Sequence, residues 1–297
     1  MKIVKPSIHI LHLHLIVFLW GFTGVLGKLL NNLDTFQLVW YRVAIACTIL
    51  AGIIIYRKLT PITNGTKFTK QLFLKVFFTG FIVFLHWLCF YGAVKVSNVS
   101  VALASFSCTA LFTGIFEPLI LKRKLDPREI ILGVVIIAIM VFIFNAEISY
   151  WKGMLLGVGA AATASLFTVI NSTISNKVNA YYISFIELFS VLFFSTIYFL
   201  FFDLDHFPNF NLQGYDYIWI VVLSILCTVY TFVASINLMK HVSPFTLSLT
   251  VNLEPVYAIL FAFVLFKEYE LLSTSFFIGT AMLIAVVLIY PVFKSKQ

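Results

Sequence analysis

The stretch TLSLTVNLEPVYAILFAFVLFKE, residues 246–268, decides the fold class. It is as long and as apolar as a helix that crosses a bilayer, which takes about twenty apolar residues. Near its middle it carries an acidic residue and a helix-breaking proline, Glu254 and Pro255. An ionisable residue at the bilayer centre costs roughly 2.5–3.5 kcal/mol on insertion scales, so it usually faces a bundle interior or a water-filled path. The stretch therefore predicts a membrane helix with a polar function.

The composition of the whole chain agrees with this prediction. Of its 297 residues, 61% are hydrophobic and 11% are charged, whereas an average soluble domain has about 25% charged residues. So few polar side chains cannot cover a water-facing surface, and the chain is expected to be a multi-pass membrane protein in a lipid bilayer. Its formal charge of +8 does not indicate nucleic-acid binding, because the basic residues lie in short connections between apolar runs.

Ten apolar runs, bounded by charged residues, Pro, Asn or Gly, predict an all-α protein with ten transmembrane helices. The first run resembles a signal sequence but lacks a small-residue cleavage site, so we expect it to remain as a helix. The four cysteines lie inside apolar runs, and we expect neither disulfides nor a metal site nor a cofactor. The expected helices cover residues 9–30, 36–56, 71–93, 98–121, 128–146, 152–174, 181–202, 215–238, 244–266 and 272–293.

The basic residues predict the orientation. If the N-terminus is cytoplasmic, 15 of the 20 Lys and Arg residues fall on the cytoplasmic side and four on the other, which leaves Arg42 inside the membrane. Basic residues are enriched in cytoplasmic connections. Both termini, including Lys2, Lys5 and Lys296, are therefore expected in the cytoplasm.

A shift of 145 residues reveals an internal repeat. It places Lys95 on Lys240 and Lys122 on Lys267, and each of the first five expected helices on one of the last five. The repeat predicts two domains, residues 1–146 and 147–297. Because five helices per half is an odd number, the second half is expected upside down, a construction found in secondary transporters. Chance agreement among apolar helices of similar length is the alternative.

Four charged residues are expected at membrane depth. Arg42 and Glu187 are equivalent under the 145-residue shift, and a buried ion pair between them would relieve both desolvation penalties. This pair would be either a static contact or a gate that changes partner during transport. Glu117 lies near the expected cytoplasmic end of its helix and is interpreted as an interfacial partner of Lys122 and Arg123.

The fourth, Glu254, precedes Pro255, which removes one backbone amide and frees the carbonyl of Val251. A free carbonyl one turn from a carboxylate is suited to a polar binding patch. Thr250 and Tyr257 lie on the same helix face as Glu254 and are included in this candidate site. A proline-kinked helix in which Glu254 only pairs is the alternative.

Polar-tipped aromatic and histidine side chains supply further candidates. Trp20 lies among glycines that permit close helix packing, and the third and eighth helices, which are repeat equivalents, carry the rest. Such a set suits an organic solute with an apolar or cationic part, although core packing is the alternative for each residue. The candidates on those two helices are His86, Trp87, Tyr91, Tyr230 and Asn237.

His9, His12 and His14 begin the first helix. Their spacing does not bring three imidazoles to one helix face, so we expect an interfacial role and no metal. Nucleotide-binding and common hydrolase motifs are absent from the sequence. Any uphill transport is therefore expected to use an ion or solute gradient, and a proton coupled through Glu254 or His86 is our hypothesis for the ion.

Four segments together resemble the EamA-type branch of the drug/metabolite transporter superfamily. They are LWGFTGVLGK (19–28), WYRVAIA (40–46), SNVSVALASFSCTALFTGIFEPLILKRKL (97–125) and LEPVYAILFAFVLFKE (253–268). The resemblance implies an inverted five-plus-five fold and export or exchange of small metabolites, often amino acids. It also implies a cavity lined by helices 1, 3, 4, 6, 8 and 9. Ala110 stands where members often have proline, so the fourth helix is expected to be less kinked than the ninth.

The residue pattern and the resemblance together predict a permease that works by alternating access as a monomer or homodimer, and the resemblance implies a bacterial inner membrane. The first alternative is an intramembrane enzyme acting on a lipid, for which Asp203, Asp205 and His206 are the candidate residues. The second alternative is a passive channel or a sensor.

Overall fold

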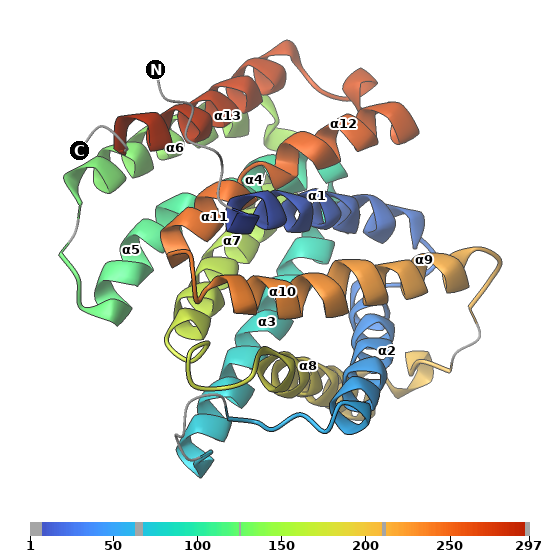
Figure 1. The fold of residues 1–297 in the computed structure, drawn as a ribbon. Helices are drawn as coiled ribbons and strands as arrows, with labels where there is room; N and C mark the ends of the chain where they lie inside the picture. Colours follow the sequence, from blue (N-terminus) through green and yellow to red (C-terminus); the bar gives the residue numbers. More distant parts are fainter. Residues whose placement is uncertain (1–7, 63–67, 125, 210–211, 295–297) are drawn as a thin grey trace.

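The computed structural model describes residues 8–62, 68–124, 126–209 and 212–294, which form helices joined by short connections (Figure 1). The first half contains α1 (Ile8–Leu29), α2 (Thr35–Tyr56), α3 (Lys70–Val96), α4 (Val99–Phe106), α5 (Thr109–Leu121) and α6 (Pro127–Ala146). The second half contains η1 (Ile148–Tyr150), α7 (Trp151–Ser172), α8 (Ala180–Phe202), η2 (Leu204–His206), α9 (Asp216–Ser224), η3 (Ile225–Tyr230), α10 (Thr231–Leu238), α11 (Pro244–Val251), α12 (Glu254–Phe266), η4 (Glu268–Glu270) and α13 (Thr274–Lys294).

Eight helical segments of the described chain are long and apolar enough to cross a membrane. Four of the eight are composite: α4 with α5, η1 with α7, α9 with η3 and α10, and α11 with α12. α6 and α13 occupy the places expected for the fifth and tenth helices and pack against each other. The all-helical class is confirmed, and the count of ten spans stays a prediction. Lys2, Lys5 and Lys296, on which the orientation partly rests, lie outside the described residues.

Local sequence signals fix the helix ends, and they repeat with the shift of 145. Asp34 caps α2 and its equivalent Asn179 caps α8, each through a side-chain oxygen that accepts backbone N–H bonds. Asn98 and Ser243 cap α4 and α11 in the same way. The repeat seen in sequence landmarks is therefore also a repeat of helix boundaries.

The packing of the helices has twofold pseudo-symmetry (Figure 1). α2 packs on its own equivalent, α8, and α6 packs on its equivalent, α13. The contact of α1 with α12 is matched by that of α7 with α5, and the contact of α4 with α12 by that of α5 with α11. Contacts between equivalent elements require a pseudo-twofold axis that passes between the halves, and the core lies around this axis.

Both composite spans α4–α5 and α11–α12 are interrupted at equivalent places, so the prediction of a less kinked fourth helix is wrong. Pro255 accounts for the interruption before α12, but its equivalent is Ala110. In the first half, hydroxyl groups replace the proline: Ser107 donates to the carbonyl of Leu103, and Thr109 donates to that of Phe106. Side-chain bonds of this kind compete with the backbone ladder and bend helices.

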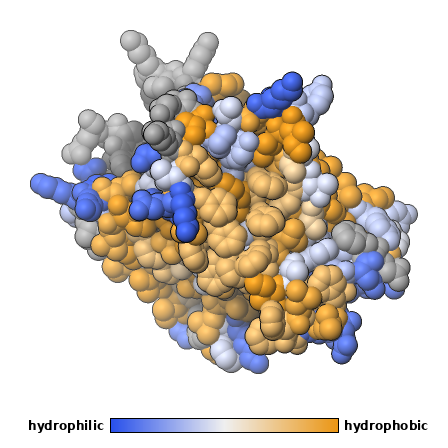
Figure 2. Space-filling model, turned by 90° about the horizontal axis from the view of Figure 1, so that it is seen from below, coloured by the Kyte–Doolittle hydropathy of each residue, from blue (hydrophilic) through white to orange (hydrophobic). Residues whose placement is uncertain are grey.

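The outer surface is apolar over a wide area. Figure 2 shows the underside, where α8 and the lower ends of α2 and α3 lie in Figure 1, with hydrophilic residues at its opposite margins. Phe189, Phe193 and Phe201 of α8 are all exposed. Phenylalanine exposed over such an area is typical of a surface that meets lipid.

Candidate functional site

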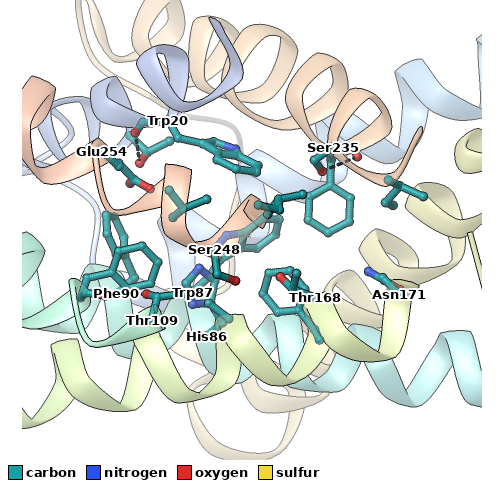
Figure 3. A pocket seen from close by; sticks show the side chains of 18 of the residues that line it. Trp20, His86, Trp87, Phe90, Thr109, Thr168, Asn171, Ser235, Ser248 and Glu254 are labelled. Atoms are coloured by element: carbon teal, nitrogen blue, oxygen red, sulfur yellow. Dashed lines mark hydrogen bonds between the residues drawn. The ribbon is translucent and has the colours of Figure 1, made fainter. Parts of the chain in front are cut away.

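A cavity of about 70 Å³ lies at the centre of the helix bundle (Figure 3). One water needs about 10–15 Å³ measured in the same way, so the cavity has room for several waters or for part of a small solute. Its walls come from α1, α2, α3, the α4–α5 span, α7, α10 and the α11–α12 span. Trp20, His86, Trp87 and Glu254 all line it.

The cavity lies on the pseudo-twofold axis, because residues that are equivalent under the 145-residue shift line it in pairs. The rings of Trp87 and Phe232, one such pair, are 6.1 Å apart. Further pairs are Thr23 with Thr168, Phe90 with Ser235, and Thr109 with Glu254.

Arg42 of α2 supplies a buried guanidinium to the cavity wall. Its Nε donates to the hydroxyl of Thr228 at 2.6 Å, Nη1 donates to the hydroxyl of Tyr91 at 2.6 Å, and Nη2 donates to the carbonyl of Cys227 at 3.0 Å. The guanidinium also lies 4.1 Å from the ring centre of Trp87. These contacts offset the cost of burying a charge, because each N–H or ring contact replaces part of the lost hydration.

The acceptors for Arg42 depend on a local departure from the α-helix. Residues 225–230 form the π-helix η3, in which the normal i to i−4 bonding is disturbed. The hydroxyl of Thr228 donates to the carbonyl of Leu223, five residues earlier, and the carbonyl of Cys227 is left to accept from Arg42. The π-helix therefore opens the backbone where the guanidinium binds.

Glu254, the first residue of α12, faces the cavity from the α11–α12 span (Figure 3), whereas Arg42 lines it from α2. Its side chain is buried, contacts the hydroxyl of Thr23 and interacts electrostatically with the charge of Arg42. The cavity wall thus carries one cationic and one acidic group that do not form a direct ion pair among the described contacts. A solute with opposite charges can interact with both.

The predicted ion pair between Arg42 and Glu187 is wrong. The guanidinium of Arg42 turns toward η3 and Tyr91. Glu187 lies fully buried between α8, α3 and α7, where one oxygen accepts from the side-chain amide of Asn171 at 3.2 Å. Equivalence in a repeat does not by itself bring two side chains together: Arg42 lines the cavity on the axis, whereas Glu187 does not line it.

The remaining predicted residues divide into three groups. Tyr91 is buried behind the cavity wall and acts on it through Arg42. Thr250 donates to the carbonyl of Thr246 within its own helix, and Tyr257 packs edge-on against Phe18 of α1, so neither lines the cavity. Tyr230 and Asn237 line a different groove on the far side of α10.

Sequence reasoning missed several polar residues of the cavity: Thr23, Thr109, Thr168, Asn171, Ser235 and Ser248. Small hydroxyl residues are common at helix interfaces and gave no signal by themselves. The repeat held the missing signal. The residue 145 positions before Glu254 is Thr109, and the residue 145 positions after Trp87 is Phe232. Both Thr109 and Phe232 line the cavity.

One end of the bundle is closed by a contact that we call the Glu268 cap. Glu268 is fully buried and accepts from Lys28 at 2.8 Å, from the amides of Val99 and Ser100 at 3.1 and 2.9 Å, and from the hydroxyl of Ser100 at 2.6 Å. The N-terminus of α4 is a favourable place for a carboxylate, because its first amides lack helical partners.

The opposite end has a matching contact, the Glu117 cap. Glu117 accepts from the amide of Phe245 at 2.9 Å, at the N-terminus of α11, and pairs with Arg123 at 3.3 Å. Arg123 also pairs with Glu129 at 2.7 Å. The interpretation of Glu117 as an ion-pair partner of Arg123 is confirmed. Each cap fastens the C-terminal end of one composite span to the N-terminal end of the other.

The residues considered for an enzyme lie at the surface. His206 and Asp203 are 2.6 Å apart on and beside η2, with the His206 side chain mostly exposed. Among the described residues, no group of three His, Cys, Asp or Glu side chains is placed to hold a metal ion. His9 and His12 line the groove that Tyr230 also lines.

Comparison with known proteins agrees with this architecture. The model of the EamA-like transporter family matches residues 7–145 and again residues 151–290. The chain belongs to the EamA-like transporter family. A search of curated proteins gives no match. Among 26 matching chains of solved structures, one crystal structure, described only as that of a protein, has a TM-score of 0.70 at 15% identity and covers 97% of this chain and 99% of its own. The EamA-like chain therefore shares its fold with a solved structure over nearly its whole length.

Proposed function

We propose that this EamA-like protein is a secondary transporter that exports or exchanges a small zwitterionic metabolite, such as an amino acid, by alternating access. The observation that carries the proposal is the position of the cavity: it lies on the pseudo-twofold axis between the Glu268 and Glu117 caps. A site on the axis of an inverted repeat is exposed to either side by opposite tilts of the same two halves.

The charges of the cavity support a zwitterion. The guanidinium of Arg42 suits a carboxylate, for which its fork of N–H groups is shaped. Glu254 suits an ammonium group, and Trp20 and Trp87 form apolar faces beside it.

The orientation and setting complete the proposal. The protein works in a bacterial inner membrane, as a monomer or homodimer, with both termini in the cytoplasm and with the Glu268 cap on the outer side. A proton coupled through Glu254 drives transport. The buried His86, whose Nδ1 is 2.9 Å from the carbonyl of Ala160, is held in place by a backbone partner and is the weaker of the two candidates.

The test is counterflow of labelled amino acids into proteoliposomes that contain the purified protein. We expect saturable counterflow of at least one zwitterionic amino acid. Glu254→Gln should reduce it about tenfold or more, since a lost charged contact is worth about 1.5–3 kcal/mol, and should abolish its pH dependence. Thr250→Ser, on the same span but outside the cavity, should transport normally.

Two outcomes would contradict parts of this proposal. Absence of counterflow for every amino acid tested, with a folded protein, would reject the solute class. An unchanged pH dependence in Glu254→Gln would remove Glu254 from proton coupling while leaving transport itself in place.

A further inference from the structure

A second hollow lies on the outside of the bundle, and we call it the lateral groove. It has a volume of about 620 Å³ and lies between α1, α2, the start of α8 and the η3–α10 segment. α10 separates it from the central cavity: Val233 and Asn237 line the groove, whereas Phe232 and Ser235 line the cavity. The groove is therefore distinct from the proposed transport site, and its volume is in the range of ligand sites.

The inner wall of the groove is apolar, and the groove is hollow because these apolar side chains are small for their positions. Ile49 and Ile53 of α2 and Val229 of η3 form this wall. The repeat provides the comparison, since each position has an equivalent at the other end of the bundle. The equivalents of Ile49, Ile53, Val229 and Tyr181 are Phe194, Tyr198, Phe84 and Phe36.

At the other end these larger rings fill the same place. Phe36 stacks on Tyr198 with ring centres 3.6 Å apart. Phe84 lies 6.3 Å from Phe36 and 6.3 Å from Phe194. The fold therefore tolerates four packed aromatic rings at these positions, and the groove exists because this end has isoleucine and valine instead. Tyr181, the one ring kept, has its hydroxyl 3.4 Å from Arg57.

One end of the groove is basic. Lys240, His9, His12 and His241 line it, and no acidic residue is among the described residues that do. The rings of His9 and His241 stack at 4.1 Å, and His12 Nε2 is 2.9 Å from the hydroxyl of Tyr230.

The position of the basic end along the helices matches a membrane surface. α1 and α8 begin beside the groove, at Ile8 and Ala180, while α2 and α10 end beside it, at Tyr56 and Leu238. Four helix ends therefore mark one face of the membrane. Ile49 lies about two turns inward from the end of α2. Lys240 and His241, which follow the end of α10, and His9, the second residue of α1, thus lie at head-group depth, and Ile49 lies at hydrocarbon depth.

We propose that the lateral groove binds one anionic phospholipid. Its phosphate lies near Lys240 and the histidines, as head groups do in basic pockets between transmembrane helices, and an acyl chain lies along Ile49, Ile53 and Val229. The apolar wall and the basic end match the two parts of one lipid molecule. This site is independent of the solute transported through the central cavity.

The proposal is tested by native mass spectrometry of the full-length protein. The protein is released from nanodiscs that contain equal parts phosphatidylglycerol and phosphatidylcholine. We expect one retained phosphatidylglycerol per chain. The double variant Ile53→Phe/Val229→Phe, which fills the groove with rings that the other end accommodates, should lose it. Lys240→Gln should reduce the preference for phosphatidylglycerol about fivefold, near the effect of one lysine at an anionic surface.

Lys152→Gln is the matched control, because Lys152 is an exposed lysine outside the groove. It should retain lipid as the unchanged protein does. Equal retention of both lipids by the unchanged protein, or unchanged retention in Lys240→Gln, would overturn the proposal. So would displacement of the lipid by millimolar inorganic phosphate, which would indicate a site for a soluble anion. The side chain of Lys240 is partly exposed, so Lys240→Gln is expected to fold. It therefore keeps the test decisive even if the double variant fails to fold.

Discussion

The guanidinium of Arg42 uses three separate N–H groups and one ring face inside the bundle. Only arginine has this set, since lysine presents a compact ammonium without a planar face. The arrangement holds α2 against α3 and η3 and at the same time presents positive charge to the cavity.

Arg42→Lys should therefore destabilise the protein although it keeps the charge. Loss of about two interhelical hydrogen bonds and the contact with Trp87 should lower the free energy of unfolding by about 2 kcal/mol, since such bonds in membranes are worth about 0.6–2 kcal/mol each. Thermal unfolding in detergent measures the change. Arg57→Lys, at an exposed position with one long bond to Tyr181, should leave the Tm unchanged; an equal drop in both variants would contradict this account of Arg42.

The pair of His206 and Asp203 gives a prediction about pH. The hydrogen bond and the negative charge of Asp203 raise the pKa of His206 above its ordinary value. A histidine with a raised pKa stabilises the fold at low pH, and this contribution is lost as pH rises through the raised pKa. Asp203→Asn should return the pKa of His206 to its ordinary range. NMR titration of the imidazole protons measures this, and an unchanged pKa would show that the contact does not form in solution.

At the scale of the helices, α3 and α8 pack closely at a glycine. A Cβ on Gly80 would lie 2.5 Å from the carbonyl oxygen of Glu187 and 2.8 Å from its Cα. Backbone atoms cannot move aside as a side-chain tip can. Gly80 therefore sets the distance between the two helices and fixes the position of Glu187.

Gly80→Ala should lower the free energy of unfolding by about 1–3 kcal/mol, the usual effect of overpacking. Gly52→Ala is the matched control, because a Cβ on that helical glycine meets no atom within 4 Å; it should be neutral or stabilising by up to about 1 kcal/mol. Thermal or denaturant unfolding of both variants checks this. A neutral Gly80→Ala would show that α3 and α8 are farther apart than described.

Over the whole molecule, the Glu268 cap and the Glu117 cap are equivalent kinds of contact at opposite ends of the protein. Breaking one cap should favour opening at its own end. The variant Ser248→Cys, made in a protein whose four native cysteines are replaced, places a single thiol in the cavity. The reaction of this thiol with a membrane-impermeant reagent reports access to the cavity from outside. In intact cells Glu268→Gln should accelerate the reaction several-fold, because it removes the ion pair with Lys28 and weakens the bonds to α4.

Glu117→Gln should slow the same reaction, because it favours opening at the other end. Opposite signs in the two variants are the signature of alternating access. If both variants accelerate labelling, the caps only hold the bundle together; if neither changes it, they do not control access.

Much of this architecture could be predicted from the sequence, because membrane helices and repeats leave long signals. The shift of 145 paired the helices of the two halves, and Lys122 and Lys267 do mark equivalent helix ends. Trp20, Trp87 and Glu254 could be placed in a cavity because the cost of a polar group in lipid restricts where it points.

The rest depends on side-chain direction, which a repeat does not specify. Arg42 was assigned the wrong partner because its real acceptors include the carbonyl of Cys227. This carbonyl is freed by a π-helix, and no residue type in the sequence indicates a π-helix at that place. Tyr230 lies on the correct helix but on the opposite face from the cavity. The absence of proline at Ala110 was misleading because hydroxyl groups interrupt the same helix by another route.

Lys122 and Lys267 also have a practical consequence for protein engineering. Both adopt the left-handed backbone conformation, with φ of 55° and 53°, directly after α5 and α12. This conformation costs an L-residue roughly 1–2 kcal/mol that glycine avoids. The two sites give a designer a symmetric pair of glycine replacements that would yield a more heat-resistant protein for biochemical work, without altering the cavity, the caps or the groove.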